Sequence, residues 1–487
     1  MNKSRVKGLL VILGLLPIIL SAKTIDITKI GAKGDGKTDD TEFLQKAIDE
    51  CFTEGGGVVS VPSGIYLIRP LELKSNVNLH LEQGALLLGS TRLADYDSAF
   101  PMEGGTMNQS SGLIYARGQE NIAVTGTGII DGQGGSSTFQ FGNDADGGPK
   151  RPKLIYFVEC KTIQVTDITL RNSAYWVQHY EKCEDVVIRG LKVFSHCNYN
   201  NDGLDIDAKN AVISDCYIDV EDDAICFKSD HPELCENITV TNCVTASNCN
   251  AIKFGTSSLG GFRNISVSNC VVRHAKEDNI RHWSKQLKHI TADITVISGI
   301  AIEMVDGGVI DGITISNISM RDVQTPIFIR LGDRRRTFSK QIGSLKNINI
   351  SNIVATAESL IACSITGVKE AKVENVSINN VQITYPGGGT RDMITRTVPE
   401  VEQSYPENRM FGHTLPGAGF YVRHAKNIYF NNVRFSSLVS DERPLFFFDD
   451  VVGVELNQCK GMKPTDAKFI RTINSSGISA DGKWLNQ

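Results

Sequence analysis

Three aspartates in the middle of the chain have the type and spacing needed for acid–base chemistry. Asp202 lies in the carboxylate-rich run 200–207, and Asp222 and Asp223 follow in the run 221–224. Adjacent carboxylates repel one another, so one of such a group is expected to hold a proton near neutral pH. Glycoside hydrolysis needs this combination, because one carboxyl group protonates the leaving oxygen while another activates water.

Two other interpretations of these carboxylates stay open at this stage. Asp and Asn are also frequent in tight turns, because their short side chains bond to the local backbone. Several carboxylates close together could instead hold Ca²⁺, which binds multiple oxygen ligands. The spacing alone is compatible with a catalytic site, with turn residues and with a calcium site.

A repeat predicts the elements that would position these aspartates. Nine marker positions are each followed by apolar residues one, three and six places later, and the first two of these alternate with polar residues, as in Ile238-Thr239-Val240. This alternation has the period of a strand and not of a helix. The markers are Thr162, Asp185, Asn210, Asn237, Asn264, Gly312, Asn347, Asn375 and Asn427.

The spacing of the markers predicts a parallel β-helix, an all-β solenoid. Most steps are 23 to 28 residues; we interpret the steps of 48 and 52 as double steps and the step of 35 as a single step with an insertion. A short strand recurring at this interval with no helical partner indicates stacked coils. An antiparallel sandwich would require recurring hairpin turns, and these are not the repeated feature. The 20 or 21 residues from Asp202 to Asp222 or Asp223 are about one coil, and neighbouring coils stack at ~4.8 Å. We therefore expect the three side chains to converge.

The ends of the chain differ from the repeat. Residues 1–22 have a basic start, an apolar run and a small-residue cleavage site, which predict a signal peptide and a secreted or periplasmic protein. The apolar run is too short for a membrane span of ~20 residues. Residues 23–487 are then one catalytic domain. Residues 36–54 predict an amphipathic helix that caps the N-terminal end of the solenoid.

Composition limits the partners and the cysteine chemistry. The net charge of −5 gives no electrostatic support for a nucleic-acid partner. Of the twelve cysteines, Cys216, Cys243 and Cys270 recur 27 residues apart, so we expect them to stack as small buried side chains. The pairing of the other nine stays open.

On these motifs the chain resembles glycoside hydrolase family 28, the polygalacturonases and rhamnogalacturonases. Asn200-Asn201-Asp202 is similar to the family's Asn-Thr-Asp motif, and Asp222-Asp223 is similar to its Gly-Asp-Asp motif, with Glu221 in place of Gly. The opening segment 31–40 is also similar, although other pectin-active β-helices share it. Lys228 follows the aspartate pair at a matching position.

The resemblance implies a right-handed single-stranded parallel β-helix and an inverting glycosidase acting on pectic polysaccharide. Asp222 then corresponds to the general acid, and Asp202 and Asp223 to the pair that activates water. Inversion requires an acid–base separation of ~6.5–9.5 Å. We expect no cofactor and no metal, a polysaccharide or oligosaccharide partner, and a monomer.

The chain departs from the family at two motifs. Asn250 falls where the family has a His, and Ala301 and Glu303 replace the two cations of its Arg-Ile-Lys motif. Glu303 would repel a substrate carboxylate at that subsite, so a sugar without a carboxylate there fits better. The substrate is therefore rhamnogalacturonan-like or galacturonan-like, with rhamnogalacturonan favoured.

Asn250 and Glu303, at these two motifs, are candidates for binding the sugar, and further residues join them. Lys228, Lys253 and Arg330 are cations on the expected strand stack, and Trp176 and His179, with Tyr175, lie one coil before Asp202. Each could instead be a surface charge or a packing residue. His274, His282 and Trp283 are candidates to replace the family's His.

Two irregular segments predict attack at chain ends. Residues 385–418, which include Tyr385, Tyr405 and Phe411, and residues 273–289 both leave the coils near the catalytic stack. Either could close one end of the site, although both could also lie on the far face. Two alternative functions stay open: a non-catalytic glycan-binding β-helix and a calcium-dependent pectate lyase.

Overall fold

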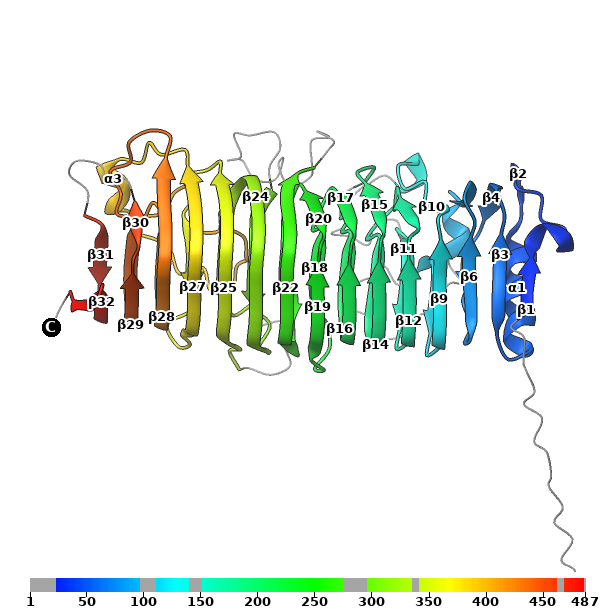
Figure 1. The fold of residues 1–487 in the computed structure, drawn as a ribbon, viewed down its shortest axis with the longest axis horizontal. Coiled ribbons are helices and arrows are strands. Elements are labelled where there is room, and N and C mark those ends of the chain that lie inside the picture. The colour runs from blue at the N-terminus through cyan, green and yellow to red at the C-terminus, as the bar shows by residue number, and fades with distance from the viewer. Residues whose placement is uncertain are drawn as a thin grey trace, which may run out of the picture.

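The chain is built from coils that stack along one long axis, with the two ends of the chain at opposite ends of the stack (Figure 1). The computed structural model describes residues 23–96, 111–139, 151–198, 200–275, 296–334, 341–461 and 468–485. Apart from one terminal antiparallel pair, the strands in these ranges pair in parallel with the coil before and the coil after. The predicted all-β, right-handed parallel β-helix is confirmed.

Each coil passes in turn through three parallel sheets, which we call the site sheet, the ladder sheet and the third sheet. The strands of the site sheet are β5 (Leu71–Glu72), β8 (Gly112–Arg117), β11 (Lys153–Val158), β18 (Ile225–Ser229), β21 (Asn250–Ser258), β23 (Val296–Met304), β26 (Cys363–Thr366) and β31 (Ile470–Ile473). The strands of the ladder sheet are β1 (Lys23–Asp26), β3 (Gly57–Val61), β6 (Val77–Leu81), β9 (Glu120–Gly126), β12 (Lys161–Thr166), β19 (Cys235–Thr241) and β32 (Ser476–Ala480), which pairs with β33 (Lys483–Trp484).

The third sheet and the long strands complete the coils. The third sheet contains β2 (Asp35–Asp39), β4 (Gly64–Ile68), β7 (Ala85–Gly89), β10 (Ile129–Asp131), β13 (Thr169–Arg171), β15 (Lys192–Ser195), β17 (Tyr217–Val220), β20 (Val244–Ser247) and β30 (Lys460–Gly461). Strands that bend from one sheet into the next are β14 (Gln178–Arg189), β16 (Leu204–Ser214), β22 (Gly261–His274), β24 (Val309–Leu331), β25 (Ser344–Ala357), β27 (Val373–Tyr385), β28 (Phe420–Ser437) and β29 (Phe446–Asn457). The helical turns are η1 (Ile27–Ile30), η2 (Leu93–Tyr96), η3 (Ser137–Phe139) and α3 (Arg391–Ile394).

The nine marker residues begin the ladder sheet on successive coils. All nine have a positive φ, between 54° and 78°, which Asn and Gly adopt at lower cost than other residues. The apolar residue after each marker is buried and pairs with its equivalent on the next coil, as Ile238 does with Ile265. The residues that the periodic pattern marks are therefore also residues that pair between coils.

The interpretation of the two long marker steps was wrong. Ile265 pairs directly with Ile313, and Val376 pairs directly with Ile428, so the steps of 48 and 52 residues are each one coil with a long insertion. The insertion in the second case is residues 386–419, between β27 and β28, which we call the excursion. Marker spacing cannot distinguish a long insertion from a coil that lacks its marker, and only the strand pairing decides.

The N-terminal end is closed by helix α1 (Thr41–Thr53), at the blue end of the stack in Figure 1. Leu44, Ala47, Ile48 and Cys51 form its buried face. The capping helix is confirmed, but it begins later than the predicted 36–54. The preceding residues form β2, where Asp35 accepts hydrogen bonds from the backbone of Lys37 and Thr38 and so favours a turn.

The fold places the three recurring cysteines on successive coils. Cys216, Cys243 and Cys270 are buried at equivalent points of successive coils, and all twelve cysteines are free thiols.

No helix in the described ranges is long and apolar enough to cross a membrane. The predicted signal peptide, residues 1–22, lies outside the described residues.

Candidate active site

Neighbouring coils bring the three predicted aspartates together. Asp202 precedes β16, and Asp222 and Asp223 precede β18, which pairs with β16. The backbone N–H of Gly203 donates to the carbonyl oxygen of Asp223 at 2.8 Å, so the two loops lie side by side. All three aspartates are 3% exposed or less. Their assignment as catalytic residues stays a prediction, and their proximity is a property of the structure.

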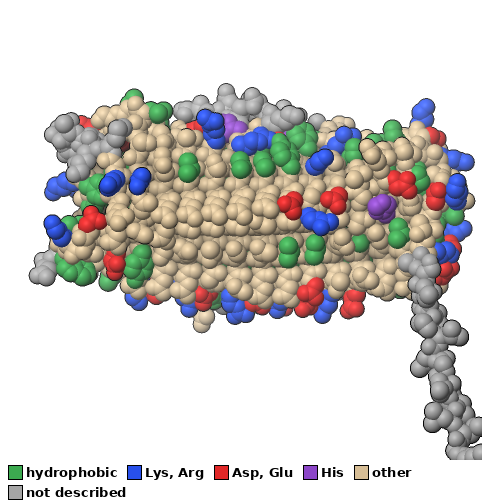
Figure 2. All heavy atoms as spheres, in the orientation of Figure 1, with side chains coloured by type: hydrophobic (Ala, Val, Ile, Leu, Met, Phe, Trp, Pro, Cys, Tyr) green, Lys and Arg blue, Asp and Glu red, His purple; other side chains and the backbone are tan. Residues whose placement is uncertain are grey.

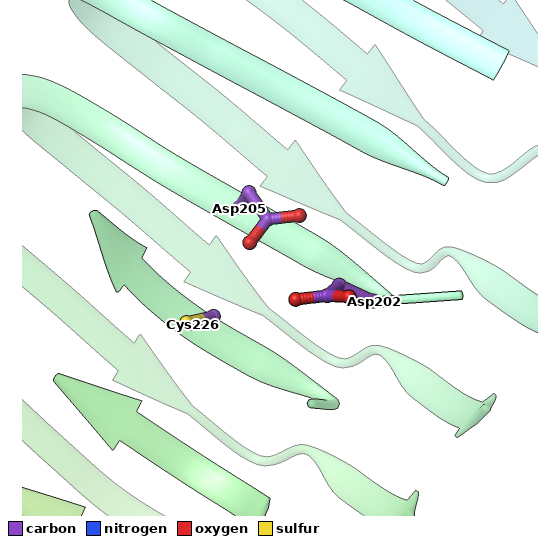
Figure 3. A group of neighbouring side chains, drawn as sticks. All are labelled: Asp202, Asp205 and Cys226. Carbon is purple, nitrogen blue, oxygen red and sulfur yellow. The ribbon is translucent and has the colours of Figure 1, made fainter. Parts of the chain in front are cut away.

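A fourth carboxylate, Asp205, joins this group. Figure 3 shows Asp202 and Asp205 on one coil and Cys226 on the neighbouring strand, and one ligand atom of each lies within 4.8 Å of the others. Lys228 Nζ lies 3.2 Å from Asp205 Oδ1 and 3.6 Å from Asp202 Oδ2. Sequence reasoning did not select Asp205, although its place in the run 200–207, beside Asp202, was an available signal.

The surroundings separate the carboxyl groups by their pKa. Burial, followed by repulsion from Asp205 and Asp222, raises the pKa of Asp202 well above its usual value. Burial likewise raises the pKa of Asp205 to about 7, although Lys228 opposes the change. Burial alone would also raise the pKa of Asp223, but Lys253 and Lys228 outweigh it and hold that pKa below the usual value. The group therefore combines a carboxylate with carboxyl groups that retain a proton.

Asp223 is fixed by contacts from the next coil. Its Oδ1 accepts hydrogen bonds from the backbone N–H and the Nδ2 of Asn250, at 3.1 and 2.8 Å. Its Oδ2 accepts a hydrogen bond from Lys253 Nζ at 2.9 Å. Both residues were predicted to bind the sugar, and the structure places both against Asp223. Binding of sugar by either residue stays a prediction.

Asp222 is held from the other side. Asn200 Nδ2 donates to Asp222 Oδ2 at 3.3 Å, and the backbone N–H of Asp223 donates to Asp222 Oδ1 at 2.9 Å. Arg151 donates to Asn200 Oδ1 at 3.0 Å and thereby turns the Asn200 amide group toward Asp222. Sequence reasoning did not identify Arg151, because it is far from the motif in the chain.

Glu303, a candidate for binding the sugar, is buried beside Lys253. Its side chain is 0% exposed, Thr256 Oγ1 donates to its Oε2 at 3.0 Å, and Lys253 Nζ lies 3.9 Å from the same oxygen. In this arrangement its charge is opposed by Lys253, and its contact with a sugar stays a prediction. Burial raises the pKa of Glu303 to about 7, although Lys253 opposes the change.

The aromatic residues of the preceding coil form one packed group. Trp176 stacks on Tyr175, with ring centroids 5.1 Å apart, and meets His179 edge-to-face at 5.0 Å. Lys228 Nζ lies 4.5 Å from the centre of the Trp176 ring. Burial holds the pKa of His179 well below its usual value, so the imidazole is neutral. Trp176 thus packs beside the aspartates through Lys228, and its stacking on a sugar stays a prediction.

Arg330 contacts the excursion. Its guanidinium donates to the carbonyl oxygens of Gly367 and Glu400 at 2.9 and 3.1 Å, and lies 5.4 Å from the centre of the Phe411 ring. It pairs in register with Glu303, two places along the strand from the level of Lys253. Its observed role is therefore to hold the excursion, and contact with a sugar stays a prediction.

The excursion lies over the site sheet. Val398, Phe411 and Leu415 pack with Tyr421 and Phe447, which belong to β28 and β29. Asn408 donates to the carbonyl oxygen of Ile297 in β23 at 2.8 Å. Tyr405 Oη accepts a hydrogen bond from Lys253 Nζ at 3.1 Å, so the excursion reaches the aspartate group.

The other residues proposed to close the site are placed differently. Tyr385 ends β27 and donates to the carbonyl oxygen of Gly419, away from the aspartates. His274 Nε2 lies 2.5 Å from the carbonyl oxygen of Asp322 and 3.4 Å from Glu358. His282 and Trp283 lie outside the described residues, so their proposed replacement of the family's His is still a prediction.

Comparisons with known proteins show the family of the chain. The model of "Glycosyl hydrolases family 28" matches residues 57–404, and that of "Rhamnogalacturonase A/epimerase, pectate lyase-like" matches residues 24–84. A probable polygalacturonase of Vitis vinifera is 31% identical over 43% of this chain and 45% of its own, and an exo-poly-alpha-D-galacturonosidase of Dickeya chrysanthemi is 30% identical over 42% of each. These two matches thus span less than half the length of each relative.

A solved structure shares the fold. The exopolygalacturonase of Thermotoga maritima superposes with a TM-score of 0.58 and 22% identity, covering 74% of this chain and 87% of its own. At this identity the likeness supports the β-helix alone. The family model, by contrast, matches more than half of the chain. The chain therefore belongs to glycosyl hydrolases family 28.

Proposed function

We propose that the chain is an inverting glycoside hydrolase that cleaves glycosidic bonds in a pectic polysaccharide, at chain ends. The observation that carries this proposal is the buried group of Asp202, Asp222 and Asp223 on adjacent coils. A non-catalytic glycan-binding module has no need for buried carboxyl groups with opposed protonation preferences.

The roles of the three aspartates follow from the family and from their contacts. Asp222 donates its proton to the glycosidic oxygen as the bond to the anomeric carbon breaks. Asp223, whose surroundings favour the ionised form, takes a proton from water on the opposite face of the sugar. Asp202, on the coil before, binds the same water. The water oxygen becomes the new anomeric hydroxyl, so the configuration inverts.

The cations around the carboxylates favour hydrolysis over calcium-dependent elimination. Lys228 lies within 3.6 Å of Asp202 and Lys253 lies 2.9 Å from Asp223. These ammonium groups supply the positive charge that a bound Ca²⁺ would otherwise bring to the carboxylates. A hydrolase needs no further cation at these positions.

The substrate class rests on the family and on the subsite beyond Lys253. The names of the relatives include polygalacturonase and exo-poly-alpha-D-galacturonosidase, which are pectin-directed activities. Ala301 and Glu303 are both buried, so neither presents a charge to a sugar on that side. We therefore retain both galacturonan and rhamnogalacturonan as substrates, with an uncharged contact at this subsite.

The excursion supports attack at chain ends. It covers the site sheet on the C-terminal side of the aspartates and brings Tyr405 to Lys253. A wall on one side of the catalytic residues leaves room for a chain terminus and blocks a chain that continues through. Cleavage from a terminus should release small products while the viscosity of the polymer stays nearly constant.

One incubation tests the proposal. The protein is mixed with galacturonan and rhamnogalacturonan fractions, and early products are identified by mass spectrometry while viscosity is followed. Saturated small products at nearly constant viscosity are expected. Unsaturated products would indicate a lyase, and binding without products would indicate a glycan-binding module. A rapid fall in viscosity with mixed oligomers would contradict attack at chain ends.

Secretion is proposed on the sequence of residues 1–22 alone. A basic start followed by an apolar run and small residues is the pattern of a cleaved export signal. Export would bring the enzyme to a polymer that is too large to enter a cell. N-terminal sequencing of the protein recovered outside the cytoplasm should begin near residue 23.

A further inference from the structure

Lys253 is surrounded by protein oxygens. Its Nζ donates to Asp223 Oδ2 at 2.9 Å and to Tyr405 Oη at 3.1 Å, and lies 3.9 Å from Glu303 Oε2. An ammonium group has three N–H donors, and these three oxygens lie around it. The side chain is 1% exposed. Lys253 therefore presents almost no surface to a sugar, in contrast to a substrate-binding cation.

The three partners come from different parts of the chain. Asp223 precedes β18, Glu303 lies on β23 two strands further along the site sheet, and Tyr405 belongs to the excursion. Thr256 fixes the Glu303 carboxyl group at 3.0 Å. A lone buried lysine would be strongly destabilised by the loss of water, and a buried carboxylate partner compensates for that loss. The arrangement therefore keeps a full positive charge in place beside Asp223.

We propose that Lys253 is a positioning residue, which holds Asp223 ionised and oriented for taking a proton from water, while Glu303 and Tyr405 fix the lysine. This inference rests on the proposed function, in which Asp223 is the base. Asn250 holds the other oxygen of Asp223 through two hydrogen bonds, so the carboxylate is fixed at both ends. The lowered pKa of Asp223 agrees with the arrangement.

The proposal also gives the excursion a second task. Tyr405 is 42% exposed, yet its hydroxyl group meets a lysine that is almost completely buried. The excursion is anchored to the coils by Arg330 and by Arg423, which bonds to Glu400. The excursion thereby both closes one side of the site and completes the contacts of Lys253. Displacement of the excursion would therefore weaken the contacts that hold Asp223.

The test replaces Lys253 and follows the pH profile of kcat/KM. Lys253→Met removes the charge but keeps a long apolar side chain. Without the lysine, Asp223 should bind its proton more tightly, so the acidic limb of the profile should move to higher pH. We expect kcat to fall by about 10- to 100-fold with KM little changed. Lys253→Arg, which keeps the charge, should restore the position of the limb.

Other ionisable groups also surround Asp223, and the two Lys253 variants leave them in place. They are Asp202, Asp205, Asp222, Cys226, Lys228, Cys249, Glu303 and Tyr405. A rise in KM with an unmoved acidic limb would overturn the proposal, because it would show that Lys253 contacts the substrate.

A second variant protects the test against misfolding. Tyr405→Phe keeps the ring of a partly exposed residue and removes only the acceptor for Lys253. It should shift the acidic limb in the same direction as Lys253→Met, by a smaller amount and with KM unchanged. An unmoved limb in a folded Tyr405→Phe protein would contradict the role of Tyr405.

Failure of the proposed function can be distinguished from failure of this inference. If the wild-type protein cleaves no pectic fraction, the proposed function fails. The carboxyl ¹³C resonance of Asp223, assigned through Asp223→Asn, can still be titrated in the wild type and in Lys253→Met. A titration midpoint that rises in the variant supports control of Asp223 by Lys253, and an unchanged midpoint overturns it.

Discussion

The ladder sheet and the site sheet are made by the same coils but differ in how their polar side chains are satisfied. In the ladder sheet, Asn264 donates to Asn237 at 2.8 Å and Asn237 donates to Asn210 at 3.2 Å, all at the exposed surface. In Figure 2 the middle of this face is mostly in the colour shared by the backbone and by side chains that are neither charged nor hydrophobic. Each coil there repeats the side-chain hydrogen bond that its neighbour makes.

The site sheet breaks this repetition around the aspartates. Asp205, Lys253 and Glu303 are buried within a few residues of one another on β16, β21 and β23, which with β18 are four successive strands. Buried ionisable groups reduce stability unless they are paired, and the pairing here is incomplete, because Lys228 Nζ lies 3.2 Å from Asp205 Oδ1 but no group in the described residues donates to Asp205 Oδ2. The comparison shows that the repeated contacts contribute to stability, and that the candidate catalytic residues lie where the sequence departs from the repeat.

The largest expected effect is a loss of activity, which a substitution at the site sheet should cause and a substitution in the ladder sheet should not. Asp222→Asn should lower kcat by at least about 10²–10⁴-fold, because an amide cannot donate the proton to the leaving oxygen. The melting temperature should stay close to that of the wild type, since the amide group has the same size. Asn264→Ala in the ladder sheet is the matched control and should retain full activity. Most of the activity surviving in Asp222→Asn would remove Asp222 from the role of acid.

A second expected effect is a change of the free energy of unfolding with pH, caused by Glu303 in the site sheet. The pKa of Glu303 rises from 4.5 in the unfolded chain to about 7 in the fold, chiefly through burial. The folded protein thus binds this proton more tightly, so the stabilisation is complete below pH 4.5 and is lost as the pH rises through about 7. At 1.36 kcal/mol per pKa unit, the loss is about 3 kcal/mol.

Glu303→Gln isolates this contribution. The amide cannot ionise, so the free energy of unfolding of the variant should fall less than that of the wild type as the pH rises from 4.5 to 7. Urea denaturation of both proteins at several pH values measures the difference. Parallel curves for the two proteins would show that Glu303 does not bind a proton on folding.

The smallest effect lies in the ladder sheet. Asn264 has a φ of 54° and bonds to Asn237, so Asn264→Ala should lower the free energy of unfolding by about 1–2 kcal/mol. Asn264→Gly loses the same hydrogen bond but adopts this φ without strain, and it should cost less than alanine. Chemical denaturation measures both variants. Equal losses would show that the backbone conformation contributes nothing at this position.

The same contrast explains how much the sequence could predict. The ladder sheet follows a local rule that nine markers share, so its strands and turn residues could be predicted from the markers. The proximity of Asp202 to Asp222 and Asp223 followed from the length of one coil. The two long insertions were misread because spacing alone carries no information on strand pairing.

Contacts between distant segments were beyond sequence reasoning. Glu303 was expected to face the substrate because it matches a cation position of the family's Arg-Ile-Lys motif. Its actual surroundings depend on Lys253, about fifty residues earlier, and on the excursion about a hundred residues later. Arg151 likewise reaches the aspartate group only through the fold, and no local pattern marks it. Tyr405 was named as part of a segment that could close the site, but its contact with Lys253 depends on the fold.

The stereochemistry of the first product tests the central claim most directly. ¹H NMR of the sugar released in the first moments of reaction, before the anomers equilibrate, reports the configuration at the anomeric carbon. The arrangement of Asp222 as acid with Asp202 and Asp223 around a water predicts an inverted anomer. A product that is first released with retained configuration would require a covalent intermediate on an aspartate and would contradict this account.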